Sequence, residues 1–281
     1  MNIPNMMLFT DNLDRFLSEA KRYENIMWSP KIDGVRCWAI VDENIITYIS
    51  RNKKQFKNFG VFDSEIRKIS DVLIDRFDLK YPLIIDGEVS TEDKSFRKVM
   101  TQTQRIKNVN VDKLIFYIFE LVDDNKPFYV RHKLIAKSLA NTSNKKVVLL
   151  PYYDFKGKSK DDISDLMNEW IDKGYEGIML RVKNSKYEYK RSYLGCKIKK
   201  WHRMDVEVIG VMKGKGRNKD RLGALICVTK KGRKIKVGTG FTDKEREQFI
   251  KNPPQKIEIS YKEEFPSGLL REPRFELPKY I

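Results

Sequence analysis

The stretch Ser-Pro-Lys-Ile-Asp-Gly-Val-Arg at residues 29–36 is the part of this sequence on which the fold assignment rests. It places Lys31, Asp33, Gly34 and Arg36 directly before an apolar, alternating segment. Asp-Gly is a common turn dipeptide, so this pattern alone is typical of a surface turn. Lysine amines also serve as nucleophiles in covalent catalysis. The sequence on either side decides between the two interpretations.

The residues that follow predict a mixed α+β domain over residues 1–200. Residues 36–41 and 45–50 alternate around residues 42–44, which indicates a β-hairpin. Apolar residues at helical spacing predict a helix over 63–77, and a second helix over 161–173 ends before Gly174. Short apolar runs predict strands at three further places, namely 83–89, 114–121 and 177–182.

Residues 201–281 have a different residue pattern and form the second predicted domain. Gly- and Lys-rich turns separate strand-like runs, and one short helix interrupts them over 243–250. The runs cover residues 205–211, 223–229, 233–238 and 255–262. Four or five strands with one helix suit a small barrel such as the OB-fold.

The composition indicates a polyanionic partner and excludes several kinds of site. The chain has 56 Lys and Arg against 39 Asp and Glu, a net charge of +17. Such an excess favours nucleic acid, because phosphate contacts release condensed counterions, although a generally lysine-rich composition gives the same number. Three cysteines and two histidines without paired spacing argue against disulfides and zinc sites.

No signal peptide and no membrane-spanning run is evident in the sequence. We therefore expect a soluble, cytoplasmic protein that acts as a monomer and makes no membrane contact. A two-domain chain of 281 residues also suits a virus- or phage-encoded protein.

Six ordered motifs resemble the nucleotidyltransferase superfamily of ATP-dependent DNA ligases and mRNA capping enzymes. They are residues 31–36, Ser50-Arg51, residues 86–88, residues 116–120, residues 176–181 and residues 197–199. They are most similar to the minimal viral and phage DNA ligases, of which the Chlorella virus type is an example. The resemblance implies an ATP-grasp-like ligase domain followed by an OB-fold, with ATP, Mg²⁺ and nicked double-stranded DNA as partners.

The resemblance also implies a role for each matching residue. Lys31 would attack the α-phosphate of ATP to form a lysyl-AMP, and Lys197 and Lys199 would contact that phosphate. Asp33 and Glu176 would lie near the metal ion, Asp33 also near the attacking 3′-hydroxyl. The nucleotide contacts would come from Glu88 on the ribose, Phe119 on the adenine, and Arg36 and Arg51 on the nucleotide and the 5′-phosphate of the nick.

The chemistry of Lys31 predicts a requirement for metal. A lysine of ordinary pKa near 10.4 is neutral in only about one molecule in a thousand at pH 7.4. The negative charge of a triphosphate lowers that fraction further. We expect Mg²⁺, together with Lys197 and Lys199, to depress the pKa of Lys31 and to neutralise the transferring group.

Two other functions fit parts of the sequence. A GTP-dependent capping guanylyltransferase shares the lysine motif and the barrel, and a non-catalytic DNA-binding relative would share the fold alone. Three segments of the second domain, 214–217, 222–225 and 238–241, resemble the barrel of viral and phage DNA ligases. The short connection after Arg217 leaves little room for a DNA-clasping insertion. The last family motif should begin near Arg274, where the sequence continues only to Ile281 and Lys279 could substitute for its later charged residues.

Overall fold

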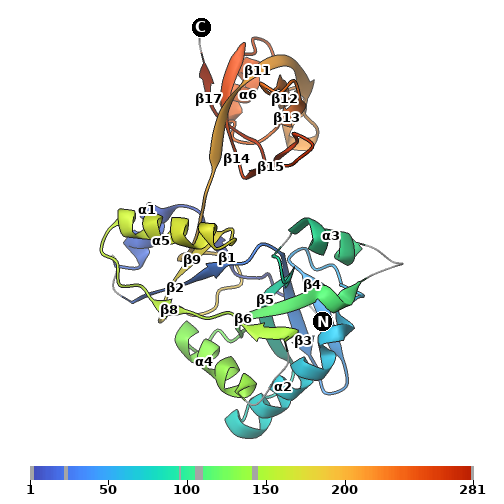
Figure 1. The fold of residues 1–281 in the computed structure, drawn as a ribbon, viewed down its shortest axis with the longest axis vertical. Helices are drawn as coiled ribbons and strands as arrows, with labels where there is room; N and C mark the ends of the chain where they lie inside the picture. Colours follow the sequence, from blue (N-terminus) through green and yellow to red (C-terminus); the bar gives the residue numbers. More distant parts are fainter. Residues whose placement is uncertain (1–2, 22–24, 95, 105–109, 141–144, 280–281) are drawn as a thin grey trace. The chain divides into compact units, whose positions relative to one another are not determined.

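The computed structural model describes residues 3–21, 25–94, 96–104, 110–140 and 145–279. They form two compact units, Met1–Lys199 and Lys200–Ile281, which we call unit 1 and unit 2 (Figure 1).

Unit 1 contains two five-stranded sheets. The first sheet has the order β1-β10-β9-β2-β8, and the second has the order β4-β3-β5-β6-β7. The first sheet consists of β1 (Leu8–Thr10), β2 (Ile26–Lys31), β8 (Tyr153–Asp154), β9 (Gly177–Val182) and β10 (Arg191–Lys199). The second consists of β3 (Val35–Val41), β4 (Ile46–Ser50), β5 (Leu83–Thr91), β6 (Leu114–Leu121) and β7 (Val147–Leu149).

Each sheet of unit 1 buries both of its faces. A cluster that includes Met7, Trp38 and Tyr187 draws on both sheets and packs between them. The outer face of the second sheet packs on α2 (Asp63–Phe77) and α4 (Phe128–Leu139). The outer face of the first sheet packs on α1 (Leu13–Glu19) and α5 (Lys160–Asp172), as Figure 1 shows. The remaining helical segments are α3 (Phe96–Gln104) and two 3-10 turns, Phe59–Phe62 and Val111–Lys113.

The stretch at residues 29–36 is the crossing between the two sheets and not a surface turn. Lys31 ends β2 in the first sheet and Val35 begins β3 in the second. Between them Ile32 is 4% exposed, and the Ser90 hydroxyl donates a 2.6 Å hydrogen bond to the Asp33 carbonyl. The chain therefore passes from one sheet to the other at the lysine, which places Lys31 beside residues of both.

Regular periodicity predicted about half of the helices and strands described in unit 1. The predicted hairpin is β3–β4, and the predicted helices are α2 and α5. Helix α4 was not predicted. Its buried positions are Phe128, Arg131, Ile135 and Ser138, so polar residues interrupt the apolar stripe that marks an amphipathic helix.

Unit 2 is a five-stranded sheet of order β13-β12-β11-β14-β17. Phe275 donates a 2.9 Å backbone hydrogen bond to Thr239, which follows β13, so the two ends of the sheet meet as in a small barrel. The elements are β11 (His202–Lys213), β12 (Leu222–Val228), β13 (Lys234–Val237), α6 (Asp243–Phe249), β14 (Lys256–Tyr261) and β17 (Arg274–Lys279), with the short hairpin β15 (Glu263–Glu264) and β16 (Leu270–Arg271) and a 3-10 turn at Gly216–Asn218. The four predicted strand regions and the predicted helix are all present.

Candidate active site

Lys31 and Glu176 meet although 145 residues separate them. Lys31 pairs with Gly177 where β2 and β9 run side by side, and the Glu176 amide donates a 3.1 Å hydrogen bond to the Lys31 carbonyl. Their side chains then approach so that the Lys31 Nζ lies 2.5 Å from the Glu176 Oε2. Strand pairing therefore fixes the contact between the predicted nucleophile and the predicted metal ligand.

Two glycines permit the close backbone approaches around this contact. A Cβ on Gly34 would lie 2.3 Å from the Val89 carbonyl oxygen. A Cβ on Gly177 would lie 2.1 Å from the Ile198 carbonyl oxygen, and Gly177 has a φ of +149°, which favours glycine. Gly34 therefore lets the segment after Lys31 approach β5, and Gly177 lets the segment after Glu176 approach β10.

The second sheet supplies Arg36, Glu88 and Phe119. Arg36 on β3 pairs with Glu88 on β5, and Glu88 pairs with Tyr117 on β6. The register of β5 and β6 then shifts, so that Phe119 has no partner residue on β5. Such a bulge re-aims side chains. The Arg36 guanidinium carbon lies 5.8 Å from the centre of the half-buried Phe119 ring.

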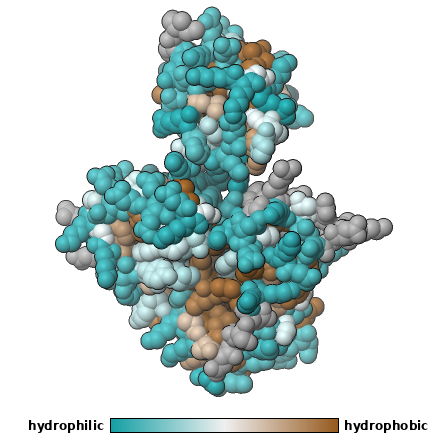
Figure 2. All heavy atoms as spheres, viewed as in Figure 1, coloured by the Kyte–Doolittle hydropathy of each residue, from teal (hydrophilic) through white to brown (hydrophobic). Residues whose placement is uncertain are grey.

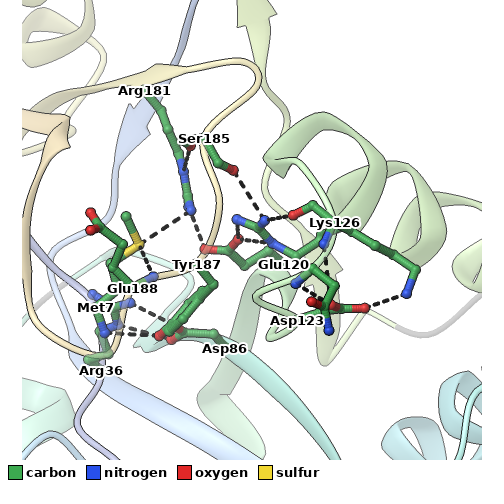
Figure 3. Close-up of polar contacts among 12 residues, drawn as sticks. Met7, Arg36, Asp86, Glu120, Asp123, Lys126, Arg181, Ser185, Tyr187 and Glu188 are labelled. Atoms are coloured by element: carbon green, nitrogen blue, oxygen red, sulfur yellow. Dashed lines mark hydrogen bonds and ion pairs between the residues drawn. The ribbon is translucent and has the colours of Figure 1, made fainter. Parts of the chain in front are cut away.

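A buried aspartate holds the Arg36 side chain. Arg36 makes two parallel hydrogen bonds to Asp86, from Nε at 2.9 Å and from Nη2 at 2.6 Å (Figure 3). Asp86 is fully buried and also accepts a 2.9 Å hydrogen bond from the Tyr187 hydroxyl. That hydroxyl in turn accepts one from the Met7 amide at 3.0 Å. The Arg36 side chain is therefore held by Asp86, a partner that was not predicted from the sequence.

A second buried ion cluster, the Glu120 triad, joins three elements of unit 1. Glu120 on β6 accepts hydrogen bonds from Arg131 on α4, at 2.9 and 2.7 Å, and from Arg181 on β9 (Figure 3). All three side chains are at most 1% exposed. The Arg181 guanidinium carbon also lies 4.1 Å from the centre of the Phe128 ring. Glu120 follows Phe119, so the triad ties the Phe119 bulge to the strand that begins after Glu176.

Lys197 and Lys199 lie on β10, beside β9. Lys197 pairs with Met179 and Lys199 pairs with Gly177, so both project on the face that carries Lys31. Burial lowers the pKa of Lys197, Asp11 raises it, and the positive charges of Arg191 and Lys31 lower it, with a net lowering. The fold therefore brings Lys197 close enough to Lys31 for their charges to interact.

The carboxylates around Lys31 control its protonation. Burial lowers the pKa of Lys31, but Glu176, Glu88 and Asp33 raise it, and the net pKa lies above the ordinary value. The carboxylates thus set the direction of this shift in the protein alone, and the joint effect of Mg²⁺, Lys197 and Lys199 on the pKa of Lys31 stays a prediction.

Glu88 is the carboxyl that burial perturbs most clearly. Burial raises its pKa, while Lys31 and Arg36 lower it and Glu176 and Asp33 raise it, with a net pKa of about 7. Glu88 is thus poised between its neutral and charged forms near neutral pH. A neutral carboxyl donates a hydrogen bond and a charged one accepts, which suits a group that contacts a sugar hydroxyl.

Two predicted features are not assembled in this cluster. Arg51 lies in an exposed turn after β4, and no ion pair of its side chain is found in the described part of the chain. Within those same ranges, no three Asp, Glu, His or Cys side chains are grouped to hold a metal ion. Mg²⁺ commonly binds through one or two carboxylates together with substrate phosphates, and Asp33 and Glu176 fit that donor set.

Family models match both units. Residues 9–199 match the ATP dependent DNA ligase domain, and residues 213–277 match the DNA ligase OB-like domain. The chain belongs to the ATP-dependent DNA ligase family. The α+β ligase domain and the OB-fold that the sequence motifs predicted are thereby confirmed.

Curated relatives carry the same family name. The chain is 30% identical over 173 residues to a DNA ligase of Haemophilus influenzae, and this match covers 62% of each protein. It is 24% identical over 273 residues to a DNA ligase of Archaeoglobus fulgidus, which covers 89% of this chain and 46% of that protein. The chain thus spans about half to two thirds of the length of these two relatives.

Solved structures share the fold over nearly the whole chain. The structure named Pmar-Lig_PreS3 superposes with a TM-score of 0.81 at 28% identity and covers 99% of this chain and 68% of its own. A Lig E DNA ligase superposes with a TM-score of 0.77 at 20% identity, and the match covers 99% of this chain and 100% of that one. The Chlorella virus DNA ligase-adenylate superposes at 0.53 with 19% identity, covering the same 99% of each chain. At 20% identity or below the last two show the fold alone.

Proposed function

We propose that the chain is an ATP-dependent DNA ligase that seals 3′-hydroxyl/5′-phosphate nicks in duplex DNA through a lysyl-AMP on Lys31. One observation carries the proposal. The Lys31 amine lies 2.5 Å from Glu176 at the crossing where both sheets deliver their motif residues. Family membership supports the class of reaction, and the geometry supports the choice of Lys31 and Glu176.

The first step forms a phosphoramidate bond and releases pyrophosphate. The neutral Lys31 amine attacks the α-phosphorus, the bond from that phosphorus to the bridging oxygen breaks, and the electron pair leaves with pyrophosphate. Lys197 and Lys199 offset charge on the transferring group. Glu176 is the acceptor within reach of the ammonium proton of Lys31.

Asp33 and Glu176 are the residues that would hold a divalent cation beside ATP. Bound there, the cation supplies positive charge to the phosphates and lowers the pKa of nearby acids. Both carboxylates raise the pKa of Lys31 in the protein alone. Occupying them with a cation would remove that effect, so we propose that the metal requirement acts through the charge around Lys31.

The nucleotide would lie between Lys31 and the second sheet. Phe119 presents a half-buried ring held by the bulge, which suits stacking on adenine. Glu88 suits a ribose hydroxyl. Arg36 is fixed by Asp86, so it would act as an oriented positive group and not as a mobile phosphate clamp.

Incubation with α-labelled ATP and Mg²⁺ tests the proposal. The wild-type chain should become labelled and should then seal a nicked duplex, while Lys31→Ala should do neither. Labelled GTP in parallel tests the capping alternative, which gains no support from two matching models that are both DNA ligase models. Binding of nicked DNA without any covalent label would instead indicate a non-catalytic relative.

None of the helices that the structure describes has the length and apolar character needed to span a lipid bilayer. We propose that the protein acts in the cytoplasm as a monomer, as the sequence suggested, with nicked duplex DNA as its partner.

A further inference from the structure

The buried hydroxyl of Tyr187 joins three segments of unit 1 that lie far apart in the sequence. Tyr187 lies in the connection between β9 and β10 and is 2% exposed. Its hydroxyl accepts a 3.0 Å hydrogen bond from the Met7 amide, just before β1, and donates a 2.9 Å hydrogen bond to the Asp86 carboxylate on β5 (Figure 3). An amide N–H can only donate and a carboxylate can only accept, so the direction of both hydrogen bonds is fixed.

The surroundings of Tyr187 hold both its ring and its proton. The ring centre lies 6.2 Å from that of Trp38. The connection that carries Tyr187 is anchored on α4, because the Phe128 amide donates a 2.8 Å hydrogen bond to the Ser185 carbonyl. Burial and the charge of Asp86 raise the pKa of Tyr187. The hydroxyl therefore keeps its proton at neutral pH and remains a donor to Asp86.

Asp86 has no contact with solvent that could replace this donor. It is fully buried, and hydrophobic residues occupy the middle of the visible face of unit 1 (Figure 2). Within the described ranges its carboxylate accepts hydrogen bonds from two side chains, those of Arg36 and Tyr187, and both of them bind Oδ2. The Tyr187 hydroxyl therefore helps to fix the oxygen that meets the Arg36 Nη2.

This arrangement leaves one nitrogen of Arg36 for a ligand. Nε and Nη2 bind Asp86, whereas Nη1 makes no hydrogen bond within the part of the chain that the structure describes. The guanidinium carbon lies 5.8 Å from the centre of the Phe119 ring, the surface that suits adenine in the proposed function. A guanidinium is planar and rigid, so fixing two of its nitrogens also fixes the direction of the third.

We infer that Tyr187 is a positioning residue for Arg36. Its hydroxyl holds the Asp86 carboxylate in place, and Asp86 in turn keeps the Arg36 Nη1 directed at the bound nucleotide. Tyr187 acts through Asp86 and is itself too deeply buried to meet the nucleotide. A small displacement of a group that contacts the reacting molecule has a large effect on rate, so the loss of one hydroxyl is measurable. The inference rests on the proposed function, which supplies the nucleotide as the ligand.

The test removes the hydroxyl and compares the result with a neighbouring tyrosine. Tyr187→Phe keeps the ring that packs near Trp38 and loses both hydrogen bonds. Tyr189→Phe is the matched control, because the Tyr189 ring centre lies 5.4 Å from that of Tyr187 and its side chain is 36% exposed. The Tyr189 hydroxyl makes no hydrogen bond in the described residues. Arg36→Lys keeps the positive charge but cannot make two parallel hydrogen bonds to Asp86.

Self-adenylylation with labelled ATP below saturation measures the consequence for the site. Tyr187→Phe should lower the rate about tenfold, and Tyr189→Phe should match the wild type. If Tyr187 acts through Arg36, the double variant Tyr187→Phe/Arg36→Lys should be no more than about twofold slower than Arg36→Lys alone. A general disturbance of the structure would instead multiply the two losses, and that result would overturn the inference.

Nitrogen NMR of the arginine side chains in isotope-labelled protein tests the positioning without any activity. The Arg36 Nε–H signal is identified by its absence in Arg36→Lys. Its exchange with solvent should be roughly tenfold faster in Tyr187→Phe than in the wild type and unchanged in Tyr189→Phe. Equal exchange in all three proteins would contradict the inference. A wild-type chain that fails to label with ATP would remove the proposed function instead, and the exchange comparison would still decide whether the hydroxyl holds Arg36.

Discussion

Two lysine-bearing regions of this molecule have opposite electrostatic surroundings. In unit 1, Lys31 is half-buried near three carboxylates that raise its pKa. In unit 2, the five cations of residues 230–236 on the β12–β13 hairpin are exposed, and within the described residues only Lys231 pairs with a carboxylate, that of Glu264. The difference teaches that the net charge of +17 reflects the surface of the protein and not the candidate active site. Exposed lysines attract a polyanion at a distance, whereas Lys31 lies near carboxylates that a divalent cation would engage in the proposed function.

Glu120→Gln should give the largest effect, because it removes the one carboxylate between Arg131 and Arg181. Breaking such a buried arrangement costs roughly 3–5 kcal/mol, since uncompensated charge stays in the interior. Thermal unfolding should show a fall in Tm of about 10 °C or more. Lys230→Gln, at the surface, serves as the control and should leave Tm nearly unchanged. Equal Tm values for both variants would remove the distinction between buried and exposed ions.

Glu88→Gln should change how stability depends on pH. The pKa of Glu88 in the folded state is about 7, above its ordinary value of 4.5. A raised carboxyl pKa contributes stability that is present below pH 4.5 and is lost as pH rises through 7. The loss amounts to roughly 3 kcal/mol in wild type and should be absent in the glutamine variant. Denaturant unfolding from pH 4 to 8 measures it, and parallel curves would contradict the perturbed pKa.

Glu176→Gln should slow self-adenylylation by about 100-fold when Mg²⁺ is limiting, with partial recovery at higher Mg²⁺. The same change should move the ascending limb of the pH–rate profile to lower pH, because the neutral amine of Lys31 is the reactive form and Glu176 raises its pKa. Single-turnover labelling across pH and metal concentration measures both effects. An unaltered metal dependence with an unaltered pH profile would separate Glu176 from both roles.

Phe119→Ala should give the smallest effect, a rise in the KM for ATP of about tenfold with little change in kcat, since stacking contributes roughly 0.5–1.5 kcal/mol. Phe119→Tyr keeps the ring and should behave like the wild type. If the alanine variant instead lowered kcat alone, the ring would not be a simple stacking surface for adenine.

The sequence predicted those features that depend on a local pattern of residues. The apolar spacing of residues 63–77 gave α2 with its observed bounds, and the ordered motifs gave the family. It did not find the partners of Arg36 or Arg181, because strand pairing across 50 or more residues decides which charges meet. The bulge at Phe119 is equally invisible in a run of alternating apolar residues.

The exposed cations of residues 230–236 in unit 2 likewise show that the sequence does not reveal which charges pair. A run of lysines near residue 231 is visible in the sequence, as is the basic turn at 214–217. Only the fold shows that carboxylates of α6 pair with Arg217 and Arg221. Among the cations of residues 230–236, only Lys231 has such a partner in the described part of unit 2. Charge density in a sequence therefore says less than the pairing of those charges.

The most direct test of the account is to map the covalent nucleotide. The wild-type chain is incubated with ATP and Mg²⁺, digested under conditions that preserve phosphoramidates, and sequenced by mass spectrometry. The account predicts one adenylate on Lys31 and none on Lys197 or Lys199, and it predicts loss of the adduct in Lys31→Arg. An adenylate on any other residue, or on Lys31→Arg protein, would contradict it.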